Sequence, residues 1–110
     1  MTDPVLNPAA VHPALSPLIG AMARAGVRRV MLYGSRARGD NQVLSDIDLA
    51  VDWPGASSQD RLYIRDLVDN ARTLLDIDCV FLDSVQGGFR DNILKEGKIL
   101  YDSGHGRSPV

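Results

Sequence analysis

The chain has 110 residues and a mass of about 11.9 kDa, which is the size of one domain. Its 45% apolar and 24% charged residues are ordinary for a globular protein and exclude a disordered or fibrous chain. With 12 Lys+Arg against 14 Asp+Glu, the net charge of -2 argues against a nucleic-acid binder that works through bulk positive charge. Among the acids, 13 of the 14 are Asp and only Glu96 is Glu.

The first half of the chain predicts one helix and two strands. Ser16 as N-cap and Pro17 at the first helical position predict a helix that ends at Gly26. The β-favouring run RVMLY, residues 29–33, predicts the first strand. A helical turn and a polar loop then lead to DIDLAVDW, residues 46–53, whose alternation predicts the second strand.

The second half predicts a helix, a strand and a short helix with an extended end. The helix is capped by Ser58 and the later elements cover residues 76–82, 89–96 and 98–101. One apolar stripe marks the first of these helices as structural, namely Ile64, Leu67, Val68, Ala71 and Leu75. We therefore expect one domain over residues 15–102, between a flexible segment 1–14 and a disordered tail 103–110.

Cysteine usage and the N-terminal sequence bear on the compartment. Cys79 is the only cysteine and lies in an apolar run, which predicts a buried, unreactive thiol and no intrachain disulfide. The segment 1–17 carries four prolines and lacks the basic start and apolar run of a signal peptide. No apolar stretch approaches the ~20 residues that cross a bilayer. These features predict a cytoplasmic protein with no membrane partner.

Two aspartates stand inside the second predicted strand. Asp46 and Asp48 share a face, and a carboxylate that points at a core costs several kcal/mol unless it is neutralised. Two such carboxylates can converge on a pair of cations, as in a two-metal phosphoryl-transfer site. The third strand repeats the pattern with Asp76 and Asp78, and the strand alone does not choose between them. The alternative is an edge strand with solvated aspartates.

The segment LYGSRARGD, residues 32–40, has the features of a phosphate cradle. Gly34 follows directly on a strand and Ser35 opens a helical turn, so backbone N–H groups and a hydroxyl point outward. Arg36 and Arg38 can add charge-assisted hydrogen bonds to phosphate oxygens. The segment is not a Walker A loop, because no Gly-Lys-Ser/Thr follows. The alternative is an ordinary solvated turn.

The combination Gly34-Ser35, ten residues, then Asp46-Ile47-Asp48 resembles the G-S-x10-D-x-D signature of the polymerase-β-like nucleotidyltransferases. GSRARGD and SDIDLAV look like the minimal nucleotidyltransferases of that superfamily, and the resemblance extends from about residue 15 to the ending ILKEGKILYD. It implies an α/β (α+β) fold with a small mixed sheet flanked by helices. It also implies ATP as substrate, a two-metal Mg²⁺ site, and transfer of a nucleoside monophosphate with release of pyrophosphate.

The resemblance also implies roles for individual residues. It assigns the nucleotide phosphates to Gly34, Ser35 and Arg36, and both catalysis and the metals to Asp46, Asp48 and Asp78. Aligning IDCVFLD with the family pattern favours Asp78 over Asp76, and Asp78 is expected to help deprotonate the attacking hydroxyl. Arg38 has the weaker case for a phosphate contact. Asp52 and Asp83 lie at strand ends, where loop or cap roles are expected.

Larger members of the superfamily carry a helical domain that binds the acceptor, and a chain of this length has no room for one. The resemblance implies a separate small helical partner of the HEPN type, to whose tyrosine the chain transfers AMP as antitoxin of a toxin–antitoxin pair. Alternatives are a module that binds nucleotide or partner without catalysis, and transfer to a small molecule such as an antibiotic. No direct nucleic-acid partner is expected, although an arginine cluster keeps that alternative open: Arg24, Arg28, Arg29, Arg36 and Arg38.

Overall fold

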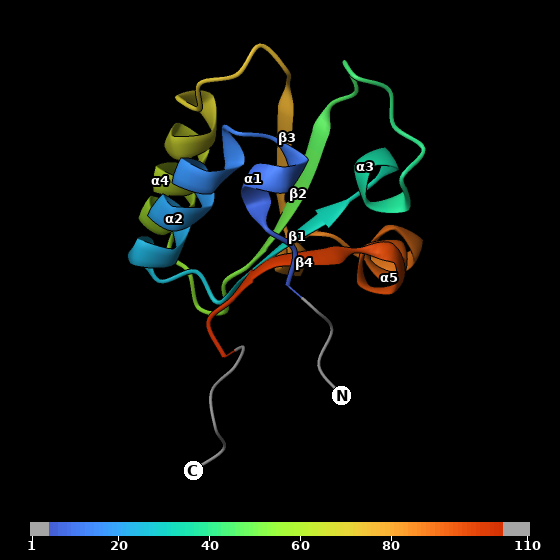
Figure 1. Cartoon of the computed structure of the whole chain (residues 1–110). Helices are drawn as coiled ribbons and strands as arrows, with labels where there is room; N and C mark the ends of the chain where they lie inside the picture. Colours follow the sequence, from blue (N-terminus) through green and yellow to red (C-terminus); the bar gives the residue numbers. More distant parts are fainter. Residues whose placement is uncertain (1–4, 105–110) are drawn as a thin grey trace.

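A computed structural model describes residues 5–104 of the chain. The elements in chain order are α1 (Pro8–Val11), α2 (Leu15–Ala25), β1 (Arg29–Tyr33), α3 (Ser35–Arg38), β2 (Ile47–Asp52), α4 (Ser58–Asp69), β3 (Ile77–Phe81), the 3₁₀ turn η1 (Leu82–Ser84), α5 (Gly87–Glu96) and β4 (Lys98–Asp102) (Figure 1). The strands form one sheet in the order β3-β2-β1-β4. β1 pairs antiparallel with β2 and β4, and β2 pairs parallel with β3. The predicted small mixed sheet flanked by helices is confirmed.

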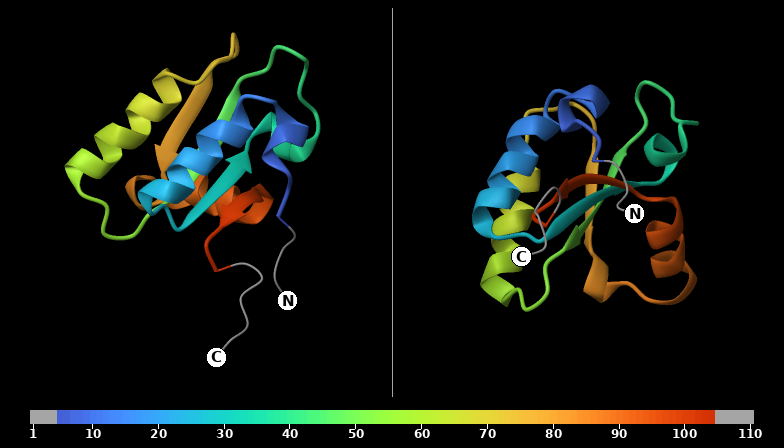
Figure 2. Two further views of the ribbon diagram at one scale, coloured as in Figure 1. Left: turned by 60° about the vertical axis from the view of Figure 1, so that its left-hand side comes forward. Right: turned by 60° about the horizontal axis from the view of Figure 1, so that its bottom comes forward.

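The two faces of the sheet carry different covers. Helices α2 and α4 lie on one face and α5 lies on the other (Figure 2). Along β2, Ile47, Leu49 and Val51 are fully buried in the larger core cluster under α2 and α4. Because side chains alternate along a strand, Asp48 and Ala50 face the α5 side, where Ala50 joins the smaller core cluster. The strand therefore presents its apolar residues to the main core and its aspartate to the other face.

Helix α2 begins one residue earlier than its predicted N-cap. It starts at Leu15, Ala14 occupies the N-cap without a side-chain hydrogen bond, and Ser16 lies inside the first turn. The prediction of Ser16 as cap is wrong because Leu15, which is fully buried, belongs to the apolar stripe that docks the helix on the sheet. Pro17 is tolerated there, since the first N–H groups of a helix have no partner within the helix.

Helix α4 is capped by Ser57 rather than by the predicted Ser58. The Ser57 hydroxyl accepts from the Asp60 N–H at 3.0 Å, and the Asp60 carboxylate accepts from the Ser57 N–H at 2.9 Å, which forms a capping box. The helix ends at Asp69, with Asn70 as C-cap. Ala71 therefore lies beyond the helix, although it still packs against the core as its place in the stripe predicts.

The N-terminal segment is more ordered than the predicted flexible residues 1–14. Val5 forms a parallel bridge with Ile99, and the Leu6 N–H donates to the Ile99 carbonyl at 2.8 Å. Leu6 and Val11 also pack against the main core. The prediction is corrected for residues 5–14, because the open edge of β4 offers backbone groups that this segment pairs with. Residues 1–4 and, in the predicted tail, 105–110 lie outside the described residues.

Strand and helix boundaries otherwise follow the predictions closely. The strand at 29–33 is confirmed as it stands, while β2 and β3 are each one residue shorter at both ends than predicted. Helix α5 begins at Gly87 and ends before Gly97, and the extended end is strand β4. None of the helices within the described part of the chain is long and apolar enough to cross a membrane.

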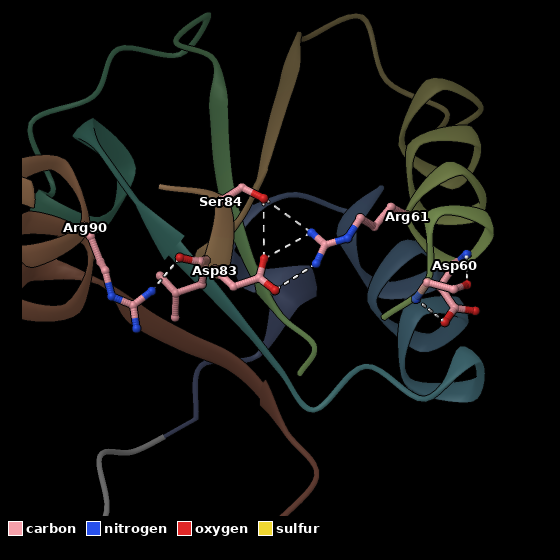
Figure 3. Close-up of polar contacts among 7 residues, drawn as sticks. Asp60, Arg61, Asp83, Ser84 and Arg90 are labelled. Atoms are coloured by element: carbon pink, nitrogen blue, oxygen red, sulfur yellow. Dashed lines mark hydrogen bonds and ion pairs between the residues drawn. The ribbon is translucent and has the colours of Figure 1, made fainter. Parts of the chain in front are cut away.

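An ion pair ties α4 to the end of β3 (Figure 3). Arg61 donates to both carboxylate oxygens of Asp83, at 2.7 and 3.0 Å, and Arg90 of α5 donates to the Leu82 carbonyl in the same turn. The predicted loop role of Asp83 is therefore an anchoring role. The hydrogen bonds from Arg61 hold the pKa of Asp83 below its ordinary value.

The lowered pKa predicts a pH-dependent contribution of Asp83 to stability. The ion pair stabilises the fold above the ordinary Asp pKa of about 3.9 and loses its effect as pH falls through the lowered pKa. We expect Asp83→Asn to lower the urea midpoint at about pH 6, and the difference from wild type to vanish near about pH 2. Urea unfolding at several pH values measures it, with Asp91→Asn as control because no described ion pair contains Asp91. A difference that persists unchanged at low pH would contradict the assignment.

Cys79 is a free, buried thiol on the main-core side of β3. Burial, the largest cause, raises the pKa of Cys79 to about 12. Since only the thiolate reacts, we expect Ellman's reagent at about pH 8 to modify the native protein at least ~10²-fold more slowly than the urea-unfolded protein. Equal rates in the two states would show that the thiol is accessible.

Candidate active site

Side chains from three neighbouring strands lie side by side on the α5 face of the sheet. In the strand register, Tyr33 of β1 lies opposite Asp48 of β2, and Asp48 lies opposite Asp78 of β3. Asp46 directly precedes β2, two residues before Asp48, on the same side. We call Asp46, Asp48 and Asp78 the acid row. Asp48 and Asp78 are each the second residue of their strand, so the acid row lies where β2 and β3 begin, and both strands begin at the same end of the sheet (Figure 1).

The structure separates Asp76 from Asp78, which the strand pattern alone leaves open. Asp76 precedes β3, and its backbone carbonyl accepts a hydrogen bond from the Ile47 N–H at 2.9 Å. Asp78 lies within β3 and pairs in register with Asp48. Parallel neighbours in register present their side chains on one face of the sheet. Asp78 is also one of the charges that raise the pKa of Asp48, and Asp76 is not among them, so Asp78 is the third member of the row.

Mutual repulsion within the acid row is visible at Asp48. Burial is the largest cause that raises the pKa of Asp48, and the negative charges of Asp78 and Asp46 raise it further. Arg38 is the cation that opposes this shift. The charge of Arg38 does not cancel the repulsion among three carboxylates, and carboxylate oxygens are ligands that Mg²⁺ accepts. The donor chemistry therefore fits a divalent cation.

The carboxylates lie in one row without being closed into a ligand cluster. Within residues 5–104, no three His, Cys, Asp or Glu side chains are gathered in an arrangement that would hold a metal ion. Asp46 and Asp78 are exposed while Asp48 is partly buried. Ligation of one ion by all three would therefore need side-chain rotation, and the assignment of the acid row to metals stays a prediction.

Gly34 lies against the acid row and has no room for a side chain. Its φ of 74° and ψ of -155° belong to a backbone region that side chains disfavour. A Cβ at Gly34 would collide with the Asp48 carboxylate, with Cγ at 3.2 Å and the Oδ2 atom nearer still. The turn between β1 and α3 therefore passes directly beside Asp48, which brings the predicted phosphate cradle and the acid row together.

The start of α3 leaves backbone donors free near this turn. The N–H groups of Ala37 and Arg38 both donate to the Gly34 carbonyl at 3.1 Å. Among the described residues, the N–H groups of Ser35 and Arg36 have no backbone acceptor, as is usual in the first turn of a helix. These two N–H groups and the Ser35 hydroxyl are suited to phosphate oxygens. The predicted phosphate role of Gly34 and Ser35 is consistent with this geometry and stays a prediction.

Arg36 braces the loop that leads into the acid row. Its guanidinium donates to the Ser45 carbonyl at 2.9 and 3.2 Å and to the Val43 carbonyl at 3.0 Å. Because Asp46 directly follows Ser45, Arg36 fixes the position from which Asp46 enters the site. Local sequence patterns do not show this contact, and the phosphate role predicted for Arg36 stays a prediction.

Arg38 interacts electrostatically with the acid row, although its case for a phosphate contact from sequence was weaker than that of Arg36. It pairs with Asp40 at 3.2 Å and with Glu96 of α5 at 3.6 Å. Its charge also lowers the pKa of Asp48, whereas Arg36 has no such effect among the causes of that shift. Of the two arginines of GSRARGD, Arg38 is therefore the one whose charge acts on Asp48.

Tyr33 is a site residue that the sequence reasoning missed. Burial, followed by the charges of Asp78 and Asp48, raises the pKa of Tyr33, so the phenol stays protonated. Its ring packs edge-to-face on Phe89 of α5, with centroids 5.7 Å apart. The available signal was its place directly before Gly34 in the sequence. A protonated Tyr33 hydroxyl beside the acid row can donate a hydrogen bond to a carboxylate or a phosphate.

The arginines proposed as a nucleic-acid surface do not act as one cluster. Arg29 and Arg28 both pair with Asp52, at 3.2 and 3.9 Å, while Arg38 pairs with Asp40. The predicted loop role of Asp52 is thus an ion-pair role at the far end of β2 from the acid row. This division of the arginines disfavours binding through a continuous basic patch.

The family profile described as "Polymerase beta, Nucleotidyltransferase" matches residues 20–105, a span that contains Gly34, Ser35 and the whole acid row. The chain belongs to this nucleotidyltransferase family. It is therefore a nucleotidyltransferase, as the resemblance of its motifs implied.

Individual relatives agree with this family. A protein of Methanocaldococcus jannaschii with the description "Putative protein adenylyltransferase" is 28% identical over an alignment of 86 positions, which covers 71% of this chain and 82% of that protein. A crystal structure of a toxin–antitoxin with AMP-PNP has a TM-score of 0.61 and 24% identity, covering 79% of this chain and 73% of that chain. The tri-AMPylated Shewanella oneidensis HEPN toxin in complex with MNT antitoxin gives a TM-score of 0.58 and 19% identity, covering 87% and 73% of the chains. These structures share the fold of this nucleotidyltransferase.

Proposed function

We propose that this nucleotidyltransferase transfers AMP from ATP to a protein hydroxyl in an Mg²⁺-dependent reaction. The observation that carries the proposal is the contact between Gly34 and Asp48, which joins a phosphate cradle to a row of carboxylates. In the reaction, the acceptor oxygen forms a bond to the α-phosphorus and the bond to the β-phosphate oxygen breaks. Pyrophosphate leaves, and the hydroxyl proton passes to a base. Bound Mg²⁺ would supply positive charge at the phosphate oxygens.

Each residue of the site has a role in this proposal. Gly34 and Ser35 bind the β and γ phosphates, while Asp46 and Asp48 are the residues that would hold the metal ions. Asp78 would add a ligand to a metal and takes the proton of the attacking hydroxyl. Positioning and electrostatic stabilisation dominate phosphoryl-transfer catalysis, so few groups suffice.

We further propose that the acceptor is a tyrosine of a separate helical protein of the HEPN type and that the chain acts as its antitoxin in the cytoplasm. Two relatives support this: the adenylyltransferase of M. jannaschii acts on protein by its name, and the S. oneidensis complex contains an AMPylated HEPN toxin.

The test uses the full chain, the purified protein encoded beside its gene, and ATP labelled at the α-phosphate. We expect Mg²⁺-dependent label on a tyrosine of that protein, located by peptide mass spectrometry. ATP labelled at the γ-phosphate is the control, because a kinase would transfer that label instead. Absence of label on the partner, with a folded chain and Mg²⁺ present, would contradict the proposal.

A function through binding alone is the second candidate. It is favoured by the acid row not being closed into a ligand cluster among the described residues. Under this candidate the chain neutralises its partner without modifying it. The variant Asp46→Asn with Asp48→Asn decides between them, since neutralisation by binding survives both substitutions and neutralisation by AMP transfer does not.

A further inference from the structure

Three exposed apolar side chains gather around one hollow of the described surface. Val43, Leu44 and Leu74 are 86%, 79% and 104% exposed, and all three line one hollow of about 770 Å³. Figure 1 shows the loops that precede β2 and β3 at the same end of the sheet, and these loops carry the three residues. We name this hollow the two-loop groove, with His12, Arg36, Val43, Leu44, Arg72 and Leu74 as its main lining.

The two-loop groove borders the acid row. Leu44 lies two residues before Asp46, so the loop that lines the groove leads directly into the site. On the other side, Thr73 and Leu75 line both the groove and a second hollow of about 420 Å³, which lies between α4 and the start of β3 and which Asp78 also lines. The groove therefore lies next to both chain segments that carry the acid row.

Hydrogen bonds hold the apolar residues of the groove in their exposed positions. Arg36 binds the carbonyls of Val43 and Ser45 on one side. On the other, the Leu75 N–H donates to the Thr73 hydroxyl at 3.0 Å. Exposed large apolar side chains cost free energy in water, and those gathered at a single hollow mark an interaction site.

The charge of the groove is opposite to that of the acid row. Its described lining includes Arg36 and Arg72 and no Asp or Glu, although the chain as a whole has a net charge of -2. Within the described residues, Arg72 takes part in no ion pair. A complementary ligand therefore carries carboxylates beside apolar side chains. A nucleotide would match the positive charge and leave the exposed apolar side chains uncovered.

We propose that the two-loop groove docks the acceptor protein, through a surface segment whose apolar side chains are flanked by carboxylates. This inference rests on the proposed transfer to a protein hydroxyl and adds where the acceptor binds. Docking there holds the acceptor hydroxyl beside the acid row, so the groove selects one protein over free tyrosine. The contribution appears in the KM for the acceptor protein rather than in kcat.

The experiment compares Leu44→Asp, Leu74→Asp and Arg72→Glu with Leu62→Asp. Leu62 is a matched control because it is 61% exposed on α4 and lies outside the groove lining. The probe is the purified protein encoded beside the gene, with affinity measured by calorimetry and transfer by α-labelled ATP. We expect each groove variant to bind the probe at least ~10-fold more weakly and to raise its KM similarly. Leu62→Asp should match wild type, and thermal stabilisation by ATP with Mg²⁺ should stay unchanged in all four.

The outcomes separate this inference from the proposed function. If the groove variants bind and label the probe like wild type, the proposed docking site is wrong. It is also wrong if these variants lose thermal stabilisation by ATP, because the groove would then bind the nucleotide. If the groove variants dissociate a wild-type dimer and still bind the probe as tightly as wild type, the groove binds a second copy of the chain and the proposed docking site is wrong. If wild type binds the probe without labelling it, and Leu44→Asp loses this binding, the docking site is supported and the proposed AMP transfer is refuted. A wild type that neither binds nor labels overturns both.

Discussion

The Asp48→Asn variant is expected to lose nucleotidyl transfer by at least ~10²-fold while its fold becomes more stable in the absence of Mg²⁺. The substitution preserves side-chain shape and removes the charge that a metal ion needs. A change of about 1.4 kcal/mol in transition-state stabilisation alters a rate tenfold, so the expected drop corresponds to a loss of at least about twice that free energy. Without metal, burial and then the charges of Asp78 and Asp46 raise the pKa of Asp48, so its neutral replacement removes the cost of burying a charge and the repulsion.

Thermal unfolding with and without Mg²⁺ gives a readout besides activity. We expect Mg²⁺ to raise the Tm of the wild type and to leave that of Asp48→Asn nearly unchanged. Asp91→Asn is the matched control, because it removes the same charge from the exposed surface of α5. Equal Mg²⁺ stabilisation of wild type and Asp48→Asn would show that Asp48 is not a ligand.

The Gly34→Ala variant is expected to lose both stability and activity. The positive φ alone costs an alanine about 1 kcal/mol, and the new Cβ collides with the Asp48 carboxylate. We therefore expect a destabilisation of about 2 kcal/mol or more in urea unfolding. The carboxylate can escape only by rotating out of its place in the acid row. Transfer should consequently fall at least ~10-fold even where the variant is fully folded.

Gly39→Ala is the matched control for this variant. Gly39 also has a positive φ, of 86°, but nothing lies within 4 Å of the Cβ that alanine would add. It should lose only about 1 kcal/mol and keep its transfer activity. Similar losses of activity in both variants would show that backbone strain, rather than contact with Asp48, makes glycine necessary at position 34.

Local sequence patterns predicted the elements because their signals are short-range. The run 29–33 is β-favouring over its whole length and is followed by Gly34, so the strand ends as predicted. At two of the places where predictions failed, a tertiary contact was stronger than a local signal. Ser16 is a good cap by type, yet burial of Leu15 begins the helix earlier. The segment at Val5 lacks strand signals and is ordered by the edge of β4.

The sequence by itself determined the family and the candidate site, since Gly34, Ser35, Asp46 and Asp48 lie within one short stretch of chain. Spacing along a turn and a strand is enough to place such residues relative to one another.

Only the tertiary structure decided what depends on pairing between distant segments. The parallel register of β2 and β3 places Asp78 opposite Asp48, and the charge of Asp78, rather than that of Asp76, acts on Asp48. The fold also places Tyr33 beside the acid row, brings the charge of Arg38 within reach of Asp48, and uses Arg36 to hold the loop before Asp46. These contacts are non-local, so composition, periodicity and spacing carry no signal for them.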